Sequence, residues 1–201
     1  MTRIKICGLS RPQDVACVNQ AKPDWCGFVV NFPKSRRSVT PDQLRSLRRE
    51  LDPSVVPVGV FVDQPVEVVT DLLNRGIISI AQLHGGEDED YTAALRAAAP
   101  GKEIWKAFPV RGPADLERAI AFPADRILLD SGQGTGRTFD WSLLRHFPRP
   151  YLLAGGLDPE NLPTAIRTLH PYGVDLSSGV ETDGLKDFTK IQAAVAAARE
   201  E

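Results

Sequence analysis

Short apolar runs and amphipathic helical segments alternate along the whole chain of 201 residues. The runs are rich in branched residues and end in glycine, proline or polar clusters, as buried strands do. Eight strands are predicted, over residues 4–7, 26–30, 56–62, 78–83, 103–108, 126–129, 151–154 and 174–177. Helices are predicted between them, among others over residues 41–51, 65–75, 91–99, 113–120, 159–169 and 188–200. Thr40-Pro41, Asp63-Gln64-Pro65 and Asp158-Pro159 each place a capping side chain beside a proline suited to a first helical turn.

Strands that alternate with helices imply right-handed crossovers and a parallel sheet. Because no linker or change of composition interrupts the pattern, we expect a single (β/α)8 TIM barrel over residues 1–201. The alternative is an open doubly wound sheet, which would carry a G-x-G-x-x-G turn after its first strand. Cys7-Gly8-Leu9-Ser10 does not match that turn, and the glycine-rich segment 132–136 follows the sixth strand instead. We expect this segment to be a loop over the mouth of the barrel.

Composition excludes several classes of protein. The net charge is −2, so no general attraction to nucleic acid is expected, and no apolar run approaches the roughly 20 residues that cross a membrane. Cysteines occur at positions 7, 17 and 26, without a CxxC pair or a recognisable secretory leader. A disulfide framework and a zinc site are therefore not expected, and the pattern fits a reducing cytoplasm. Cys17 and Cys26 are interpreted as packing residues.

Two strand ends carry groups suited to proton transfer. Cys7 closes the first strand, and in a parallel barrel that end is where ligands bind. Its thiol could act as a nucleophile or proton acceptor once its pKa is lowered, although free cysteines more often serve as small buried hydrophobes. Asp130 follows the sixth strand, where a carboxyl group with a raised pKa could act as a general acid, or could simply cap a turn.

The seventh and eighth strands end in small residues. They allow backbone N–H groups to approach an anion, so this end of the barrel is predicted to bind phosphate. The residues concerned are Gly155, Gly156, Ser177, Ser178 and Gly179. Asp175 lies two residues before the serines and could orient substrate hydroxyls or satisfy neighbouring backbone groups.

Two further strand ends carry basic side chains. The loop after the second strand contains Arg36 and Arg37, which could clamp a carboxylate or form a solvated basic surface. His84 follows the fourth strand and could contact substrate or bond to backbone. His146 and His170 lie near helix ends and are not assigned to the site.

Together these residues resemble the phosphoribosylanthranilate isomerase family, in order and spacing, over nearly the whole chain. The motifs are Lys5-Ile6-Cys7-Gly8-Leu9, Gly27-Phe28-Val29, Ser35-Arg36-Arg37, Val58-Gly59-Val60-Phe61-Val62, Gln82-Leu83-His84-Gly85, Leu129-Asp130, Gly134-Thr135-Gly136, Phe139-Asp140-Trp141, Ala154-Gly155-Gly156-Leu157-Asp158-Pro159-Glu160-Asn161 and Val174-Asp175-Leu176-Ser177-Ser178-Gly179-Val180-Glu181. Each motif alone is weak, whereas their order and spacing together are specific.

The resemblance implies a cofactor-free Amadori rearrangement of N-(5-phosphoribosyl)anthranilate in tryptophan biosynthesis. By that resemblance, Asp130 is the general acid, Cys7 the general base and Arg37 the partner of the substrate carboxylate. The loops after strands 7 and 8 would hold the phosphate. The expected partner is a small phosphosugar, with neither nucleic acid nor membrane, and the chain is expected to be a monomer or a homodimer.

Two positions depart from the family pattern. Gln133 replaces a usual glycine, and the usual proline before Gly184 is absent. Other phosphosugar barrels are alternatives. A bifunctional isomerase would carry an aspartate at the position of Cys7. Indoleglycerol phosphate synthase relies on lysines at strand ends, and this alternative stays open because Lys5 lies two residues before such an end and Lys106 lies within the fifth strand. A non-catalytic phosphate-binding barrel is a further alternative, but it would not need both Cys7 and Asp130.

Overall fold

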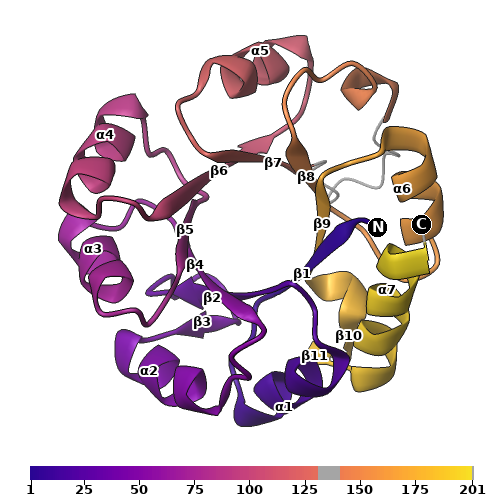
Figure 1. Cartoon of the computed structure of the whole chain (residues 1–201), viewed down its shortest axis with the longest axis horizontal. Coiled ribbons are helices and arrows are strands. Elements are labelled where there is room, and N and C mark those ends of the chain that lie inside the picture. Colours follow the sequence, from indigo (N-terminus) through magenta and orange to yellow (C-terminus); the bar gives the residue numbers. More distant parts are fainter. Residues whose placement is uncertain (131–140, 201) are drawn as a thin grey trace.

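The computed structural model describes residues 1–130 and 141–200. Gln133 and the glycine-rich segment 132–136 lie outside the described residues. Within them, eight parallel strands form a closed barrel, because β1 pairs with both β2 and β9 (Figure 1). The barrel strands are β1 (Arg3–Cys7), β2 (Trp25–Val30), β4 (Val56–Phe61), β5 (Ile80–Leu83), β6 (Glu103–Pro109), β7 (Arg126–Asp130), β8 (Tyr151–Ala154) and β9 (Gly173–Leu176). The predicted TIM barrel is confirmed.

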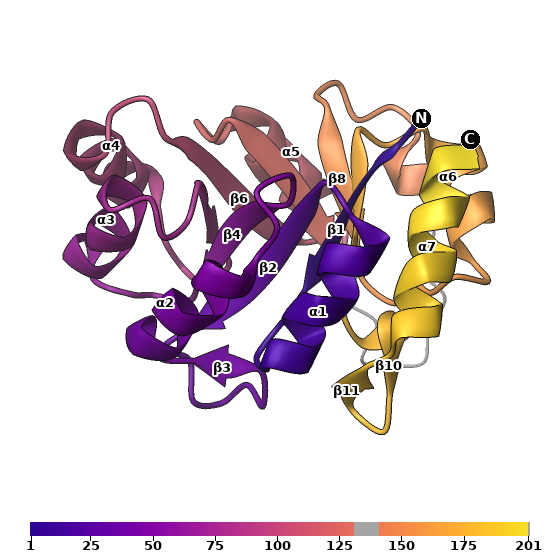
Figure 2. The same ribbon diagram turned by 60° about the horizontal axis from the view of Figure 1, so that its bottom comes forward.

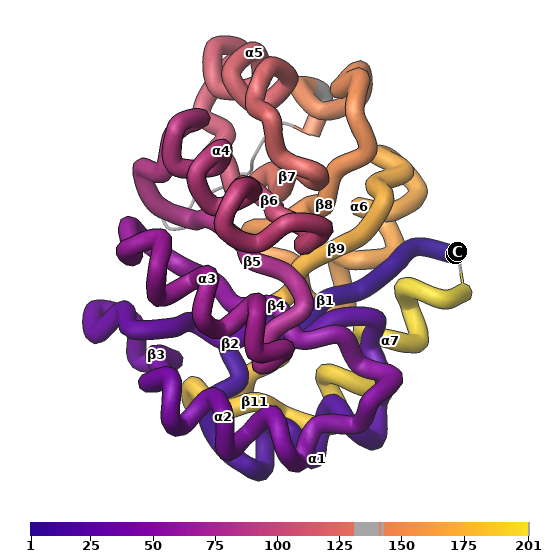
Figure 3. The backbone as a smooth tube through the Cα atoms, turned by 60° about the vertical axis from the view of Figure 1, so that its left-hand side comes forward, coloured from indigo at the N-terminus to yellow at the C-terminus, as the bar shows by residue number. Residues whose placement is uncertain are grey.

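Helices form the outer layer of the barrel, as Figures 1 and 3 show. They are α1 (Pro12–Ala21), α2 (Pro41–Glu50), α3 (Val66–Asn74), α4 (Glu89–Ala98), α5 (Pro113–Ala121), α6 (Leu162–Leu169) and α7 (Phe188–Glu200). Short 3₁₀ helices occur as η1 (Trp141–Leu144) and η2 (Ser178–Val180). A short strand β3 (Ser38–Val39) extends β2, and β10 (Glu181–Thr182) pairs with β11 (Leu185–Lys186) in a hairpin. Figure 2 shows β3 and this hairpin at the end of the barrel opposite the two chain termini.

The barrel interior changes character along the strand direction. Near the beginnings of the strands it is filled by apolar side chains, including Trp25 and Trp105, whose rings meet edge to face at 5.2 Å. Since alternate residues of a strand share a face, the inward face of β5 runs from Ile80 to Gln82 and that of β1 from Lys5 to Cys7. The interior is therefore apolar at one end and polar at the other, where the strands end.

Helix starts follow the predicted caps only in part. Thr40 caps α2 as predicted, since its hydroxyl accepts a hydrogen bond from the Gln43 N–H. The prediction that Asp158-Pro159 opens a helix is wrong: the Asp158 carboxylate accepts hydrogen bonds from the N–H groups of Glu160 and Asn161 in a tight turn, and α6 begins at Leu162. A local turn satisfies the same carboxylate that would cap a helix.

Asp63 also bonds elsewhere. Its carboxylate accepts a hydrogen bond from Gly86 N–H at 2.6 Å, so it does not cap α3, which begins after Pro65. The contact links the loop after β4 to the loop after β5, a long-range partner that the local sequence pattern does not indicate.

The β10–β11 hairpin explains one departure from the family pattern. Asp183 and Gly184, the two residues between its strands, both have positive φ, 51° and 79°. An Asp-Gly pair is well suited to this turn, whereas a proline at position 183 would be held near −65°. The missing proline therefore matches the turn that the chain adopts. In the part of the chain that the structure describes, no helix has the length and apolar character that crossing a membrane requires.

Candidate active site

A cavity of about 360 Å³ opens where the barrel strands end. All of the predicted site residues except Gly179 line it: Cys7, Arg37, His84, Asp130, Gly155, Gly156, Asp175, Ser177 and Ser178. Its remaining wall is formed by Gln82 and by apolar side chains such as Val29, Val60 and Phe32. The closed barrel thus brings together residues from both ends of the sequence, from Cys7 to Ser178.

Cys7 is 8% exposed, and its thiol and the buried ammonium of Lys5 both lie beside Gly27 of β2. Burial raises the pKa of the thiol above the ordinary value, and the charge of Lys5 acts in the opposite direction. A lowered pKa would suit this thiol to accept a proton, whereas in the structure burial outweighs the attraction of the ammonium. The thiol is therefore protonated at neutral pH, and its ionisation must draw on the positive groups around it.

Asp130 lies across the cavity beside His84. The His84 Nε2 is 3.8 Å from Asp130 Oδ2, and the side chains are 37% and 29% exposed. Burial lowers the pKa of His84, although the Asp130 carboxylate opposes that effect, so the imidazole is neutral near pH 7. A neutral imidazole beside a carboxyl group can exchange a proton or a hydrogen bond with it, which suits a site that performs acid–base chemistry.

Gln82 is a cavity residue that the sequence analysis missed. It is 1% exposed, and its Nε2 lies 3.1 Å from His84 Nδ1. With the amide assigned this way, the Nδ1 accepts and the ring proton sits on Nε2, toward Asp130. Its buried Oε1 has no hydrogen-bond partner among the described residues. The signal that could have found it is a polar side chain two residues after Ile80, on the inward face of an otherwise apolar strand.

Arg37 is held by Glu181, a second residue that the sequence analysis did not place in the site. Arg37 donates from Nε and Nη2 to the two carboxylate oxygens of Glu181, both at 2.7 Å. Arg36 and Lys186 bond to the same carboxylate at 2.6 and 2.7 Å. Arg37 lines the cavity, whereas Arg36 is 59% exposed and lies outside it. The two arginines that sequence reasoning set side by side therefore have different surroundings.

Glu181 should contribute acid-sensitive stability. Although burial opposes it, hydrogen bonds from Arg37 and Lys186 lower the pKa of Glu181 to about 2. A carboxyl group with a depressed pKa stabilises the folded state at pH values above its ordinary pKa, near 4.5. This contribution to the free energy of unfolding is lost as the pH falls toward 2. We expect the difference in unfolding free energy between wild type and Glu181→Gln to shrink by about 3 kcal/mol over that interval. Urea unfolding at a series of pH values would measure it, with exposed Glu160→Gln as control; a difference that stays constant with pH would contradict the prediction.

The loops after β8 and β9 are built around glycine. Gly155 and Gly156 have φ values of 93° and 63°, a region that side chains with a Cβ rarely adopt. Gly179 lies where the two loops touch, since a Cβ there would come within 1.9 Å of the Leu157 carbonyl oxygen. The Ser177 hydroxyl donates to the Cys7 carbonyl at 3.1 Å and so ties the β9 loop to the end of β1. These contacts fix the backbone around the predicted phosphate site.

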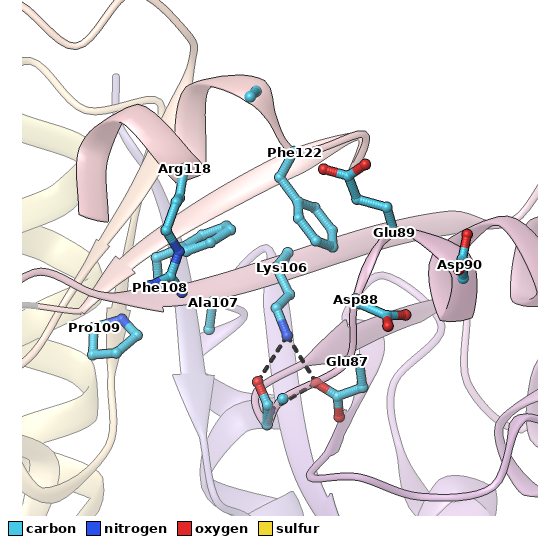
Figure 4. A pocket seen from close by; sticks show the side chains of 13 residues that line it. Glu87, Asp88, Glu89, Asp90, Lys106, Ala107, Phe108, Pro109, Arg118 and Phe122 are labelled. Atoms are coloured by element: carbon cyan, nitrogen blue, oxygen red, sulfur yellow. Dashed lines mark hydrogen bonds and ion pairs between the residues drawn. The ribbon is translucent and has the colours of Figure 1, made fainter. Parts of the chain in front are cut away.

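The lysines named in the alternative hypothesis occupy different places. Lys5 is buried inside the barrel and paired with Asp175 at 2.9 Å. Lys106 faces outward, where its Nζ donates to Glu87 at 2.9 Å and to the Gly85 carbonyl at 2.8 Å (Figure 4). It lines a separate cavity of about 600 Å³ that also borders Arg118 and Phe122 of the α5 region. Lys106 is therefore not placed to act in the cavity that holds Cys7.

A family model, curated relatives and solved structures point to the same family. The family model for N-(5'phosphoribosyl)anthranilate (PRA) isomerase matches residues 4–197. An N-(5'-phosphoribosyl)anthranilate isomerase of Endomicrobium trichonymphae is 43% identical over 196 residues, which cover 95% of each chain. The solved phosphoribosyl anthranilate isomerase of Thermotoga maritima is 36% identical, with a TM-score of 0.88 and full coverage of both chains.

A further solved phosphoribosyl anthranilate isomerase is in complex with reduced 1-(o-carboxyphenylamino)-1-deoxyribulose 5-phosphate. It is 36% identical to this chain, with a TM-score of 0.87 and full coverage of both chains. Another solved structure is described as monomers generated from the dimeric Thermotoga maritima enzyme. From its sequence, its barrel and these relatives, the chain belongs to the N-(5'-phosphoribosyl)anthranilate isomerase family and is an isomerase.

Proposed function

We propose that this chain rearranges N-(5-phosphoribosyl)anthranilate to 1-(2-carboxyphenylamino)-1-deoxyribulose 5-phosphate, with Asp130 as general acid and Cys7 as general base. One observation carries the proposal: a single cavity is lined by both a thiol and a carboxyl group, each at the end of a rigid strand. β1 and β7 are separated in the barrel by β8 and β9, so the two groups approach a bound sugar from different sides. An acid and a base held apart in this way are what the reaction needs.

The reaction proceeds by successive proton transfers at the sugar. Asp130 protonates the furanose ring oxygen, the C1–O bond breaks, and the nitrogen lone pair forms a Schiff base at C1. The Cys7 thiolate then removes the proton from C2, and the electron pair of that bond moves to give an enolamine. In the tautomerisation of the enolamine, C1 gains a proton and the C2 hydroxyl loses its proton, which leaves a ketone at C2. Atoms and electrons balance within the substrate, so the scheme asks for no cofactor.

Binding groups at the two ends of the cavity would hold the substrate during these steps. Arg37 uses Nε and Nη2 for Glu181, which leaves its Nη1 for the anthranilate carboxylate. The phosphate would lie against the glycine-containing loops after β8 and β9, at Gly155, Gly156, Ser178 and Gly179. Asp175 and His84, which also line the cavity, would face the sugar between these ends. Positioning of this kind contributes to rate by restricting the substrate to a reactive geometry.

Loss of the Arg37 side chain is expected to weaken substrate binding more than it slows the reaction. The variant Arg37→Ala removes the substrate's carboxylate partner and should raise KM by about 10-fold or more, the usual cost of a lost charged hydrogen bond, with a smaller change in kcat. Steady-state kinetics would measure both constants. Arg36→Ala is the matched control, because Arg36 contacts the same glutamate but lies outside the cavity. An Arg37→Ala enzyme with unchanged KM would assign the carboxylate to another group.

The direct test is turnover by the wild-type chain. Phosphoribosylanthranilate is unstable and would be generated in the assay from anthranilate and phosphoribosyl pyrophosphate, with loss of anthranilate-type fluorescence as the signal. Robust turnover of this substrate would support the proposal. A folded wild-type chain without turnover would contradict it and favour another phosphosugar reaction in the same cavity.

We further propose that the chain acts as one catalytic domain and that it works in the cytoplasm. The three free cysteines support the second part, because a reducing compartment keeps thiols unpaired.

A further inference from the structure

A fully buried lysine occupies the barrel interior beneath the cavity. Lys5 is 0% exposed, and its Nζ donates to both oxygens of Asp175, at 2.9 and 3.0 Å. The two residues are direct partners across the β1–β9 pairing. A buried charge is costly unless it is paired and hydrogen-bonded, and Asp175 meets that requirement. The structure therefore maintains an ammonium group at a place where burial of an apolar side chain would have a lower free-energy cost.

The same ammonium faces the thiol of Cys7. The two side chains are two residues apart on β1 and so share its inward face, where the charge of the ammonium favours the thiolate. Gly27 of β2 makes room for both side chains. A Cβ at position 27 would come within 2.7 Å of the Cys7 Sγ and 3.0 Å of the Lys5 Nζ. The missing side chain at 27 therefore lets both groups occupy one compartment.

The charged groups around the thiol come from four elements. Lys5 on β1 and Lys186 on β11 favour the thiolate, whereas Asp175 on β9 opposes it. Arg37, from the loop between β2 and β3, also interacts with Cys7 at longer range. Burial lowers the pKa of Lys5, but the charge of the Asp175 carboxylate foremost opposes that effect, so the net direction is upward and the lysine keeps its charge. Of the cations around the thiol, Lys5 acts on it most strongly.

We propose that Lys5 is a positioning residue of the reaction: its ammonium, anchored by Asp175, donates a hydrogen bond to Sγ of Cys7 and stabilises the thiolate that takes the substrate proton. This inference rests on the proposed function, because it assumes that Cys7 is the base. The ammonium does not lose its own proton in the step. When the thiol ionises, the Lys5 ammonium lies between two anions, the Cys7 thiolate and the Asp175 carboxylate. None of the three side chains has to move.

Lys5→Met tests the proposal, and Lys106→Met is its matched control. Both lysines are buried and paired with a carboxylate, but Lys106 is on the outer face of β6 and far from the thiol's compartment. The measurement is the rate of iodoacetamide alkylation of Cys7 against pH, followed by mass spectrometry of its peptide so that Cys17 and Cys26 do not interfere. In Lys5→Met the midpoint should rise by about one pH unit or more, with at least about tenfold slower alkylation below it. Lys106→Met should keep the wild-type profile.

A second variant protects the test against misfolding. Lys5→Met leaves the Asp175 carboxylate buried without its partner, so Lys5→Met/Asp175→Asn is made beside it to keep the interior neutral. In this double variant the pH midpoint of Cys7 alkylation should also rise, but by less than in Lys5→Met, because the effect of Lys5 on the thiol exceeds that of Asp175. An unchanged Cys7 profile in both variants, or an equal change in Lys106→Met, would overturn the proposal.

Turnover separates the inference from the proposed function. The pH profile of kcat in the Lys5 variants should shift in the same direction as the alkylation profile. A shifted alkylation profile with an unchanged kcat profile would overturn the role of Lys5 in the reaction. The alkylation measurement needs no substrate, so a wild-type chain without turnover would contradict the proposed function and leave the contact between Lys5 and Cys7 to be decided by alkylation alone.

Discussion

Cys7→Ala is expected to lower kcat by about 100-fold to 10,000-fold, the contribution that a positioned general base usually makes. The variant removes one sulfur atom from the wall of an open cavity, so the barrel should fold and melt close to wild type. Fluorescence assays would give kcat and KM, and circular dichroism would report the fold. KM should change little, because the contacts proposed for the carboxylate and the phosphate are untouched.

Cys26→Ala is the matched control for this variant. Cys26 is a neighbouring thiol on β2, but it is 0% exposed and packs in the layer between barrel and helices rather than in the cavity. Its truncation should lower stability and leave kcat unchanged, the reverse of the effect at Cys7. A Cys7→Ala enzyme with near-normal turnover would remove the thiol from the mechanism.

Asp130→Asn is expected to have an effect of similar size on kcat, because an amide cannot give a proton to the ring oxygen. The fall should again be about 100-fold to 10,000-fold, with the fold intact, since the two side chains have nearly the same shape. Asp125→Asn is the control, at the opposite end of the same strand region, where the Asp125 carboxylate accepts a hydrogen bond from Ile104 N–H. That variant should affect stability alone.

Two outcomes would separate the role of Asp130 from binding. Loss of kcat at constant KM would agree with an acid that acts on the reacting bond. A raised KM at normal kcat would instead make Asp130 a group that holds the sugar, and the acid would have to be sought elsewhere.

The barrel could be predicted from the sequence because its signal is local and repeated. Each strand shows its own apolar run and each helix its own amphipathic pattern, so their alternation determines the fold class. The same logic located Cys7, Asp130 and the glycine-containing turns, since strand ends in a parallel barrel meet on one side. The structure brings these residues to one cavity, while their chemical roles stay predictions that the variants above address.

Contacts between distant segments could not be predicted in this way. Glu181 and Arg37 are 144 residues apart, and Lys5 and Asp175 are 170 apart. No local pattern indicates which carboxylate holds which cation. The start of α6 was predicted wrongly for a related reason, because Asp158 could satisfy either a helix or a tight turn and the sequence does not rank the two. The hydrogen bond of Gln82 to His84 likewise depends on side-chain placement across a finished strand.

The contact between Gly179 and the Leu157 carbonyl has a consequence for how such a barrel can be altered. A single added methyl group at position 179 would collide with that carbonyl. The loops after β8 and β9 are therefore packed directly against each other, with no space for a side chain between them at this point. If one of these loops were replaced by a loop from another barrel, the new loop would have to pack against a partner loop that fits only the original one. These two segments are therefore one module for recombination, to be inherited or exchanged as a pair.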